Sequence, residues 1–342
     1  MMPQLRDRVL VSYFRLSYKV AKNIIVFIGD GMGVSTITSA RIYKGQRLGA
    51  AGEEYQLTFE KFSNVALVKT YAVDMQVPDS AATATAIFTG VKTRYESVGV
   101  DVNCNNSIFD EIVYEGCKVD SMMVWAQEAN KHTDAKGKAK DIARQLVENA
   151  PGKNYKVILG GGQQQMGHTT NYTEFCTRED GRNLTSIWAS NHTGTNYVLA
   201  SNNEQLNTVT DDTEYLMGIF APDHMPYELV RDTGPTGTPS LSDMTRKALQ
   251  VLKKGPNGFV LVVSLPAHHQ NYARLAMEET SEFDNAIALA INETGPDTLI
   301  LVTADHSHSF TMEGYSKRGN DILGYTEKAG EDDRPFLTLG IC

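Results

Sequence analysis

Short runs of apolar, largely β-branched residues recur along the chain, and several of them end at small or acidic residues. They occupy residues 24–28, 65–68, 157–159, 259–263 and 299–303. Continuous apolar runs without alternation are typical of strands that are buried on both faces, as in a parallel sheet. Segments with a helical period lie between them, at residues 142–149, 241–253 and 274–291. This order predicts an α/β sandwich, whose ligand site lies at the carboxyl ends of the strands.

Residues 163–240 show a different pattern. They are rich in Asn, Thr, Gly and Gln and have little periodicity. We expect long surface loops here, or a covering insertion within the same domain. Since the chain shows neither an internal repeat nor a low-complexity linker, we expect a single domain over residues 1–342.

The charge balance of the chain is acidic. Asp and Glu number 41 against 32 Lys and Arg, which gives a formal net charge of −9. Sequence-independent binding of nucleic acid needs a basic face, so we expect no nucleic-acid partner. No stretch approaches the roughly 20 apolar residues of a membrane span. The apolar run at residues 9–14 is too short for a signal-peptide core, and the last residues show no hydrophobic anchor tail.

Two features nevertheless indicate a location outside the cytosol. Acceptor triplets Asn-x-Ser/Thr for N-glycosylation occur at Asn105, Asn171, Asn183, Asn191 and Asn292, more than chance alone suggests. The chain also has four cysteines without the spacing of a zinc site, namely Cys104, Cys117, Cys176 and Cys342. They allow three disulfide pairings, and the sequence does not select one.

The first candidate for chemistry is Asp30. It follows the apolar run at residues 24–28 and lies between two glycines, which let the backbone turn tightly and another group approach closely. A carboxylate at the end of a buried strand suits a hard or borderline cation. The alternative is that Asp30 caps the following helix.

The second candidate is Ser80, which follows Asp79 directly before a run of small residues with helical character. A serine at a helix N-terminus meets unsatisfied N–H groups and the positive end of the dipole, which favour its alkoxide and a phosphate esterified to it. The commoner role of such a serine is an ordinary helix cap. A G-x-S-x-G motif is absent, which argues against a hydrolase triad.

Two histidine motifs follow predicted strands. Asp305 and His306 come after the run at residues 299–303 and offer an oxygen and an imidazole to one metal ion, for which zinc is the natural choice. The alternative is a strand-end Asp beside a surface His. We expect His308 to make supporting or structural contacts. One of His268 and His269, after residues 259–263, could ligate metal, or both could be loop residues.

Taken together, three strand ends and one helix N-terminus supply two aspartates, a serine and histidines. This combination indicates a metal-assisted serine nucleophile, which suits phosphoryl transfer. At this level the chain resembles the alkaline phosphatase family, most closely its insect and vertebrate branches. The stretches that carry this resemblance lie between about residues 20 and 335 and include NIIVFIGDGMG, VPDSAATATAIFTGVKT and LILVTADHSH.

The resemblance implies a large, mixed, mostly parallel central sheet sandwiched by helices, and hydrolysis of phosphate monoesters at alkaline pH with two zinc ions and one magnesium ion. It implies that Ser80 is the nucleophile that becomes phosphorylated and that Asp30 bridges one zinc and the magnesium. Asp305 and His306 would complete that zinc site, and His269 would ligate the remaining zinc. It also implies a homodimer outside the cell or lipid-anchored at its surface.

The sequence departs from the family pattern at several points. The stretch between residue 263 and His268 is four residues shorter than in the family and has no counterpart for a magnesium Glu and a zinc Asp. After residue 130 the family continues into a segment with a Thr or Ser magnesium ligand and the Arg that binds phosphate, which this chain lacks. Ala221 stands where vertebrate members have a calcium-binding Glu. The sequence ends at Cys342, before the family's third zinc histidine and crown-like subdomain.

These departures affect the metal sites unequally. The zinc site beside Ser80 has all its ligands, whereas the other zinc keeps only His269 and the magnesium keeps only Asp30. Because a catalytic zinc typically needs three protein ligands, we expect one retained zinc, a largely lost magnesium site and impaired hydrolysis. The alternative is a catalytically dead relative, or an incomplete gene model, that acts at most as a metal- or phosphate-binding protein.

Overall fold

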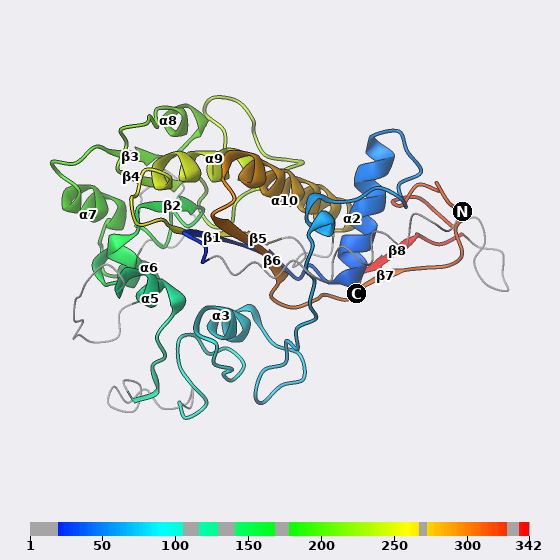
Figure 1. Cartoon of the computed structure of the whole chain (residues 1–342), viewed down its shortest axis with the longest axis horizontal. Coiled ribbons are helices and arrows are strands. Elements are labelled where there is room, and N and C mark those ends of the chain that lie inside the picture. Colours follow the sequence, from blue (N-terminus) through cyan, green and yellow to red (C-terminus); the bar gives the residue numbers. More distant parts are fainter. Residues whose placement is uncertain are drawn as a thin grey trace.

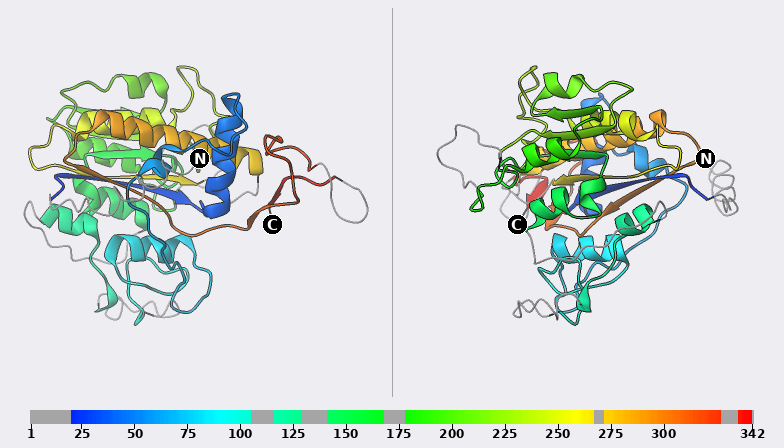
Figure 2. Two further views of the ribbon diagram at one scale, coloured as in Figure 1. Left: turned by 45° about the vertical axis from the view of Figure 1, so that its right-hand side comes forward. Right: turned by 90° about the vertical axis from the view of Figure 1, so that its left-hand side faces the viewer.

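A computed structural model describes residues 20–104, 116–128, 141–167, 178–266, 272–326 and 335–341. Strands lie at the centre of the molecule, with two long helices on one side of them and a smaller helical layer on the other (Figures 1 and 2). The long helices are α9 (Leu241–Leu252) and α10 (Ala273–Glu293). The smaller layer contains α3 (Ser80–Thr89) and α5 (Met122–Glu128).

The central sheet consists of three parallel strands in the order β5-β1-β6. They are β1 (Asn23–Asp30), β5 (Val260–Pro266) and β6 (Thr298–Ala304). In the register, Asp30 lies opposite Pro266 of β5, and Gly29 lies opposite Ala304 of β6. The carboxyl ends of all three strands therefore meet at one edge, where parallel sheets place their ligand sites.

A second parallel sheet has the order β2-β4-β3, and an antiparallel pair joins β7 to β8. The strands are β2 (Val157–Gly160), β3 (Tyr197–Ala200), β4 (Tyr215–Ile219), β7 (Phe310–Met312) and β8 (Leu339–Ile341). The remaining helical elements are α2 (Val34–Arg47), η1 (Thr58–Lys61), α6 (Ile142–Glu148), η2 (Gly152–Asn154), α7 (Leu184–Asn191) and α8 (Asn203–Asn207). The predicted α/β class with a mixed, mostly parallel arrangement of strands is confirmed.

The main core forms where α9 and α10 cover the central sheet. Phe27 of β1 packs edge-to-face against Phe283 of α10, with ring centroids 5.7 Å apart. Ile25 and Ile287 are fully buried in the same cluster. Because β1 has neighbours on both edges and its residues 25–29 are buried, its continuous apolar run is what a strand in this position requires. No helix in the described part of the chain is long and apolar enough to cross a bilayer.

Two sequence predictions need correction. Residues 65–68 are not a strand in the structure, and Val65 and Leu67 are 96% and 94% exposed. Their β-branched composition favours a strand, but strand formation also needs a neighbouring strand, and these residues pair with none of the described ones. Within residues 163–240, the structure has α7, α8, β3 and β4, where we predicted loops. The single-domain assignment stays a prediction.

Asparagines in this region act as helix caps, which explains why they suggested loops. The side chain of Asn183 accepts the N–H of Ser186 at the start of α7, and that of Asn202 accepts the N–H of Gln205 at the start of α8. Of the predicted glycosylation sites, Asn191 and Asn292 are exposed, and Asn183 is the α7 cap. Asn105 and Asn171 lie outside the described residues.

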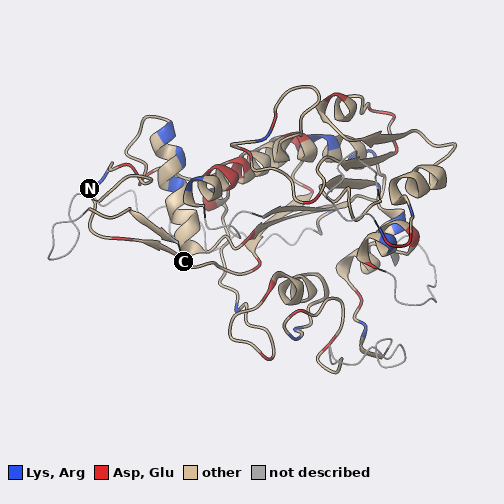
Figure 3. Cartoon of the chain, turned by 180° about the vertical axis from the view of Figure 1, so that it is seen from behind, with Lys and Arg blue, Asp and Glu red and all other residues tan. Residues whose placement is uncertain are grey.

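Helix α2 packs against α10 through opposite charges. Lys44 Nζ lies 2.8 Å from an Asp284 carboxylate oxygen, and Arg47 forms an ion pair with Glu278. Figure 3 shows the basic residues of α2 next to the acidic residues of α10. Since the Asp284 side chain is only 1% exposed, Lys44 supplies the positive charge that its burial requires. Lys44 and Arg47 therefore help to hold α2 against α10.

Glu279 of α10 is a buried carboxyl without such a partner. It is 6% exposed and accepts the backbone N–H of Glu228. Burial raises the pKa of Glu279 to about 7 from its ordinary value of 4.5, and the nearby Glu228 and Glu282 add to the effect, while the hydrogen bond and Arg231 oppose it. Between these two pH values the folded chain binds more protons than the unfolded chain, so its free energy of unfolding falls as the pH rises.

We therefore expect Glu279→Gln to stabilise the protein at pH 9 by about 1–3 kcal/mol and to change little at pH 5, where the carboxyl is neutral in the folded state. Thermal unfolding at the two pH values measures this, with the exposed Glu204→Gln as the control. An equal shift at both pH values would contradict the assignment.

Candidate metal and nucleophile site

The carboxyl ends of β1 and β6 are joined through Asp305. Its Oδ1 accepts the backbone N–H of Gly31 at 3.0 Å and that of His306 at 2.8 Å. Gly31 has φ +70°, a left-handed conformation that favours glycine, so the glycine after Asp30 allows the turn. Asp30 and Asp305, far apart in the sequence, are thereby brought to one place at the edge of the sheet.

Ser80 reaches the same place from the other side. It is the first residue of α3, and the side chain of Asp79 caps this helix by accepting the N–H groups of Ala81 and Ala82. Its Oγ lies 3.2 Å from His306 Nε2 and 3.5 Å from both carboxylate oxygens of Asp30. The ordinary capping role is therefore filled by Asp79, which leaves the Ser80 hydroxyl directed at the strand ends.

Asp30 is not the N-cap of the following helix. The N-cap of α2 is Gly33, which makes no side-chain cap hydrogen bond. A Cβ on Gly33 would come within 2.6 Å of Ser307 Cβ, so the glycine allows the turn after β6 to approach closely. That turn carries His306, which is 7% exposed and therefore not the surface histidine of the alternative interpretation.

The spacing of the donor atoms suits a tetrahedral metal ion. His306 Nε2 lies 3.4 Å from Asp30 Oδ1, 3.3 Å from Asp305 Oδ2 and 3.2 Å from Ser80 Oγ. Zinc binds nitrogen and oxygen at about 2.0–2.1 Å, so ligands at the corners of a tetrahedron lie about 3.3–3.4 Å apart. The distances from His306 Nε2 therefore suit a zinc ion shared with Asp30, Asp305 or Ser80, although Asp305 is not part of the mutually close group of ligand atoms formed by Asp30, His306 and His308.

The tautomer of His306 fits the same purpose. Its Nδ1 lies 3.2 Å from the carbonyl oxygen of Ser307. A carbonyl can only accept, so this contact places a proton on Nδ1, and Nε2 is the nitrogen that faces Asp30 and Ser80. Metal-binding histidines typically have their second nitrogen held in this way.

The structure brings a second histidine, His308, to the same cluster. Ligand atoms of Asp30, His306 and His308 all lie within 4.8 Å of one another. The rings of His306 and His308 are 5.3 Å apart between centroids. His308 therefore lies close enough to contribute a nitrogen to the same ion, whereas we expected only a supporting contact. The sequence signal was the His-x-His spacing, which places both side chains on one face of an extended segment.

The rest of the predicted metal machinery is not placed by the structure. His269, predicted to ligate a second zinc, lies within residues 267–271, outside the described residues. The segment at residues 129–140, where the family's phosphate-binding Arg is missing from the sequence, is also outside them. The ligand sets of a second zinc and of magnesium stay predictions.

Comparison with known proteins identifies the chain's relatives. A family model described as Alkaline phosphatase matches residues 21–135 and 125–340. The chain belongs to the alkaline phosphatase family. Alkaline phosphatase 4 of Drosophila melanogaster is 43% identical over 93% of this chain and 61% of its own length. The tissue-nonspecific alkaline phosphatase of Gallus gallus is 38% identical over 98% and 73%. The crystal structure of Thermus thermophilus alkaline phosphatase superimposes with a TM-score of 0.70 and 25% identity over 88% of this chain and 63% of that one.

These alignments also show how the chain differs from other alkaline phosphatases. It spans 61% of the length of the fly relative and 63% of the Thermus structure. The fly alignment covers 373 residues, more than the 342 of this chain, so the relative carries internal segments that this chain lacks. The family model matches in two parts that meet at residues 125–135, where the sequence analysis predicted a missing segment.

Proposed function

We propose that this chain hydrolyses phosphate monoesters through a phosphoserine at Ser80. The observation that carries the proposal is the position of Ser80 Oγ, 3.2 Å from His306 Nε2 and 3.5 Å from Asp30 among donors spaced for zinc. Membership of the alkaline phosphatase family supports the reaction class. Zinc would be held by Asp30, Asp305 and His306, and His308 is a further donor within reach.

The Ser80 oxygen attacks the phosphorus of the ester, the alcohol leaves with a proton, and the phosphoryl group remains on Ser80. Water then cleaves the phosphoserine, which restores the hydroxyl and releases inorganic phosphate. A zinc ion held by Asp30, Asp305 and His306 would lower the pKa of the serine hydroxyl and would neutralise charge on the phosphoryl oxygens. The chain itself aligns the hydroxyl, because Asp79 begins α3 one residue before Ser80.

The local hydrogen bonds make the reaction strongly dependent on metal. The N–H groups of Ala81 and Ala82, which could otherwise bind phosphate at the start of α3, already bond to the carboxylate of Asp79. These two N–H groups are therefore not free to bind phosphate, and the helix contributes mainly its dipole. Because the sequence also lacks the family's phosphate-binding Arg, zinc at Asp30 and His306 would supply most of the compensating charge.

The two chemical steps should differ in rate. The donors next to Ser80 are present, whereas the stretch between residue 263 and His268 offers no counterpart of the Asp that the resemblance implies for a second zinc, which would activate water. Magnesium has only Asp30. We therefore propose that phosphorylation of Ser80 is retained and that hydrolysis of the phosphoserine is slow.

This expectation predicts a burst. With zinc and an aryl phosphate at about pH 9, the purified chain should release close to one equivalent of aryl alcohol per chain in a fast phase and then turn over slowly. Stopped-flow absorbance measures both phases, and the same chain stripped of metal is the control. Zinc binding without a burst would instead support the alternative, a non-catalytic metal-binding relative.

The partners and location follow from the same proposal. The substrate is a small phosphate monoester, and a homodimer outside the cell or at its surface is the family arrangement. The disulfide Cys104–Cys117 supports an oxidising location, and so do the glycosylation triplets.

A further inference from the structure

The helix that carries Ser80 has little apolar packing of its own. Its buried side chains are small or polar, namely Ala82, Thr83, Thr85 and Thr89. The larger buried apolar clusters of the described chain lie around the two parallel sheets, α2 and α10. Beside α3 there is one small cluster, made of Val100, Cys104 and Cys117. The position of α3 therefore depends on hydrogen bonds and on this small cluster.

Hydrogen bonds attach α3 to the segment that follows it. Asp79 Oδ1 accepts the N–H of Glu96 at 3.1 Å, beside the N–H of Ala82. Thr85 Oγ1 lies 3.2 Å from the carbonyl oxygen of Ser97 and accepts the N–H of Gly99 at 3.0 Å. Thr85 and Ser97 are both nearly fully buried. Residues 96–99 therefore hold α3 at its first and second turns.

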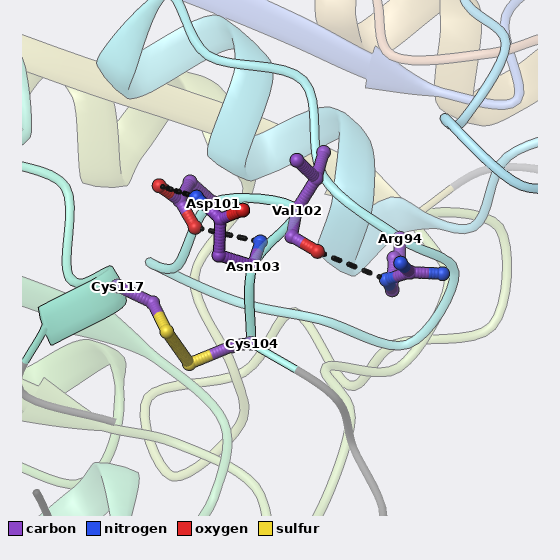
Figure 4. The surroundings of a disulfide bond; sticks show 6 residues. All are labelled: Arg94, Asp101, Val102, Asn103, Cys104 and Cys117. Atoms are coloured by element: carbon purple, nitrogen blue, oxygen red, sulfur yellow. Dashed lines mark hydrogen bonds between the residues drawn. A yellow bond between two sulfur atoms is a disulfide. The ribbon is translucent and has the colours of Figure 1, made fainter. Parts of the chain in front are cut away.

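The segment after residue 99 is fixed in turn by the disulfide. Cys104 is bonded to Cys117, which is one of the pairings that the sequence left open, whereas Cys176 and Cys342 lie outside the described residues (Figure 4). The N–H of Asp101 bonds to the Cys117 carbonyl at 2.8 Å, and the N–H of Val119 bonds to the Gly99 carbonyl at 3.0 Å. The disulfide thus closes a two-stranded contact between residues 99–104 and 117–119.

This contact continues into the main body of the molecule through α5. Gln127 Nε2 donates to the Pro151 carbonyl at 2.8 Å, and Asn154 Nδ2 donates to Gln127 Oε1 at 3.0 Å. Pro151 and Asn154 lie just before β2 in the sequence. A connected path therefore runs from the main body through α5, the disulfide and residues 96–99 to the first turn of α3.

We propose that the Cys104–Cys117 disulfide positions Ser80 against the metal donors, and that breaking it separates the nucleophile from an intact zinc site. The proposal rests on the proposed function for the role of Ser80. Asp30, Asp305 and His306 are held by the pairing of the central strands and by the hydrogen bonds of Asp305 to the N–H groups of Gly31 and His306, and Ser80 is where the disulfide path meets them. The position of Ser80 depends on the disulfide path. Reduction should therefore leave zinc binding unchanged and remove phosphoserine formation.

The test compares the oxidised full-length chain with the same chain reduced by a phosphine, which breaks the bond without removing any side chain. We expect equal zinc content per chain, a burst rate at least tenfold lower after reduction, and amide hydrogen exchange at least tenfold faster in residues 80–99 with α10 unchanged. The double variant Cys104→Ala/Cys117→Ala should have the zinc content, burst rate and hydrogen exchange of the reduced chain, and the reductant should not change them. In the control variant Cys176→Ala/Cys342→Ala, reduction should still lower the burst rate and speed up exchange in residues 80–99.

Exchange in residues 80–99 that is the same before and after reduction would overturn the proposal, and so would an unchanged burst rate. Loss of zinc on reduction would also overturn it, because the donors would then depend on the disulfide. If the oxidised chain forms no phosphoserine at all, the proposed function fails, and the exchange comparison still tests whether the disulfide holds α3.

Discussion

Ser80→Ala is expected to abolish the burst of alcohol release while leaving the zinc content of the chain unchanged. The Ser80 hydroxyl is the acceptor of the phosphoryl group in this account, and removing a nucleophile typically costs at least about 10³-fold in rate. Ser80 Oγ is only one of the donors around His306, so Asp30, Asp305 and His306 remain to bind zinc. The change should therefore separate chemistry from metal binding.

The matched control is Ser190→Ala on α7, an exposed serine whose hydroxyl bonds to a backbone carbonyl within its own helix. It should keep the full burst. Rapid-quench measurement of alcohol release, together with zinc analysis of the same samples, gives both quantities. A Ser80→Ala chain that still releases one equivalent in a fast phase would place the nucleophile elsewhere.

His306→Ala is expected to remove both zinc and the burst. The imidazole contributes the one nitrogen of the proposed set, and its Nε2 lies within 3.2–3.4 Å of donors from three other residues. Its loss removes the nitrogen that lies 3.4 Å from the Asp30 carboxylate and 3.3 Å from that of Asp305. We expect zinc affinity to fall at least about 10²-fold, since changes to groups that merely orient a ligand already cost 10–100-fold.

Competition with a zinc chelator measures this affinity, and His224→Ala, an exposed histidine on the loop after β4, is the control. His308→Ala in the same assay shows how much the second histidine contributes. If His308→Ala lost zinc and His306→Ala kept it, the ligand assignment within the cluster would be wrong.

The sequence predicted those parts of the fold in which one pattern determines one element. Strand β1 has a strand on each side, so its apolar run matches its burial, and α9 and α10 are long enough for their period to be evident. The run of β6 predicts a strand buried on both faces, but β6 has β1 on one side as its described partner, and Leu299 and Leu301 are 44% and 46% exposed. Residues 65–68 have a similar composition without a neighbouring strand, and propensity alone does not supply one. The short helices α7 and α8 begin at Asn183 and Asn202, and a pattern of caps is hard to distinguish from a pattern of loops.

The candidate site was predictable to the extent that it lies on strand ends. Parallel strands bring Asp30 and Asp305 to one edge whatever the side chains around them do. That Ser80 would join these residues was inferred from the combination of residue types and from the resemblance, because no local pattern relates α3 to β1. The role available to His308 and the pairing of Cys104 with Cys117 depend on three-dimensional distances, and the sequence could not supply these.

The central claim is that one zinc ion lies between Ser80 and the ends of β1 and β6. Anomalous X-ray diffraction at the zinc absorption edge, from crystals of the oxidised chain grown with zinc, tests it most directly. We predict a single strong peak at about 2.0–2.2 Å from Asp30, Asp305, His306 Nε2 and Ser80 Oγ. A zinc ion bound away from Ser80, or no zinc at this edge of the sheet, would contradict the account.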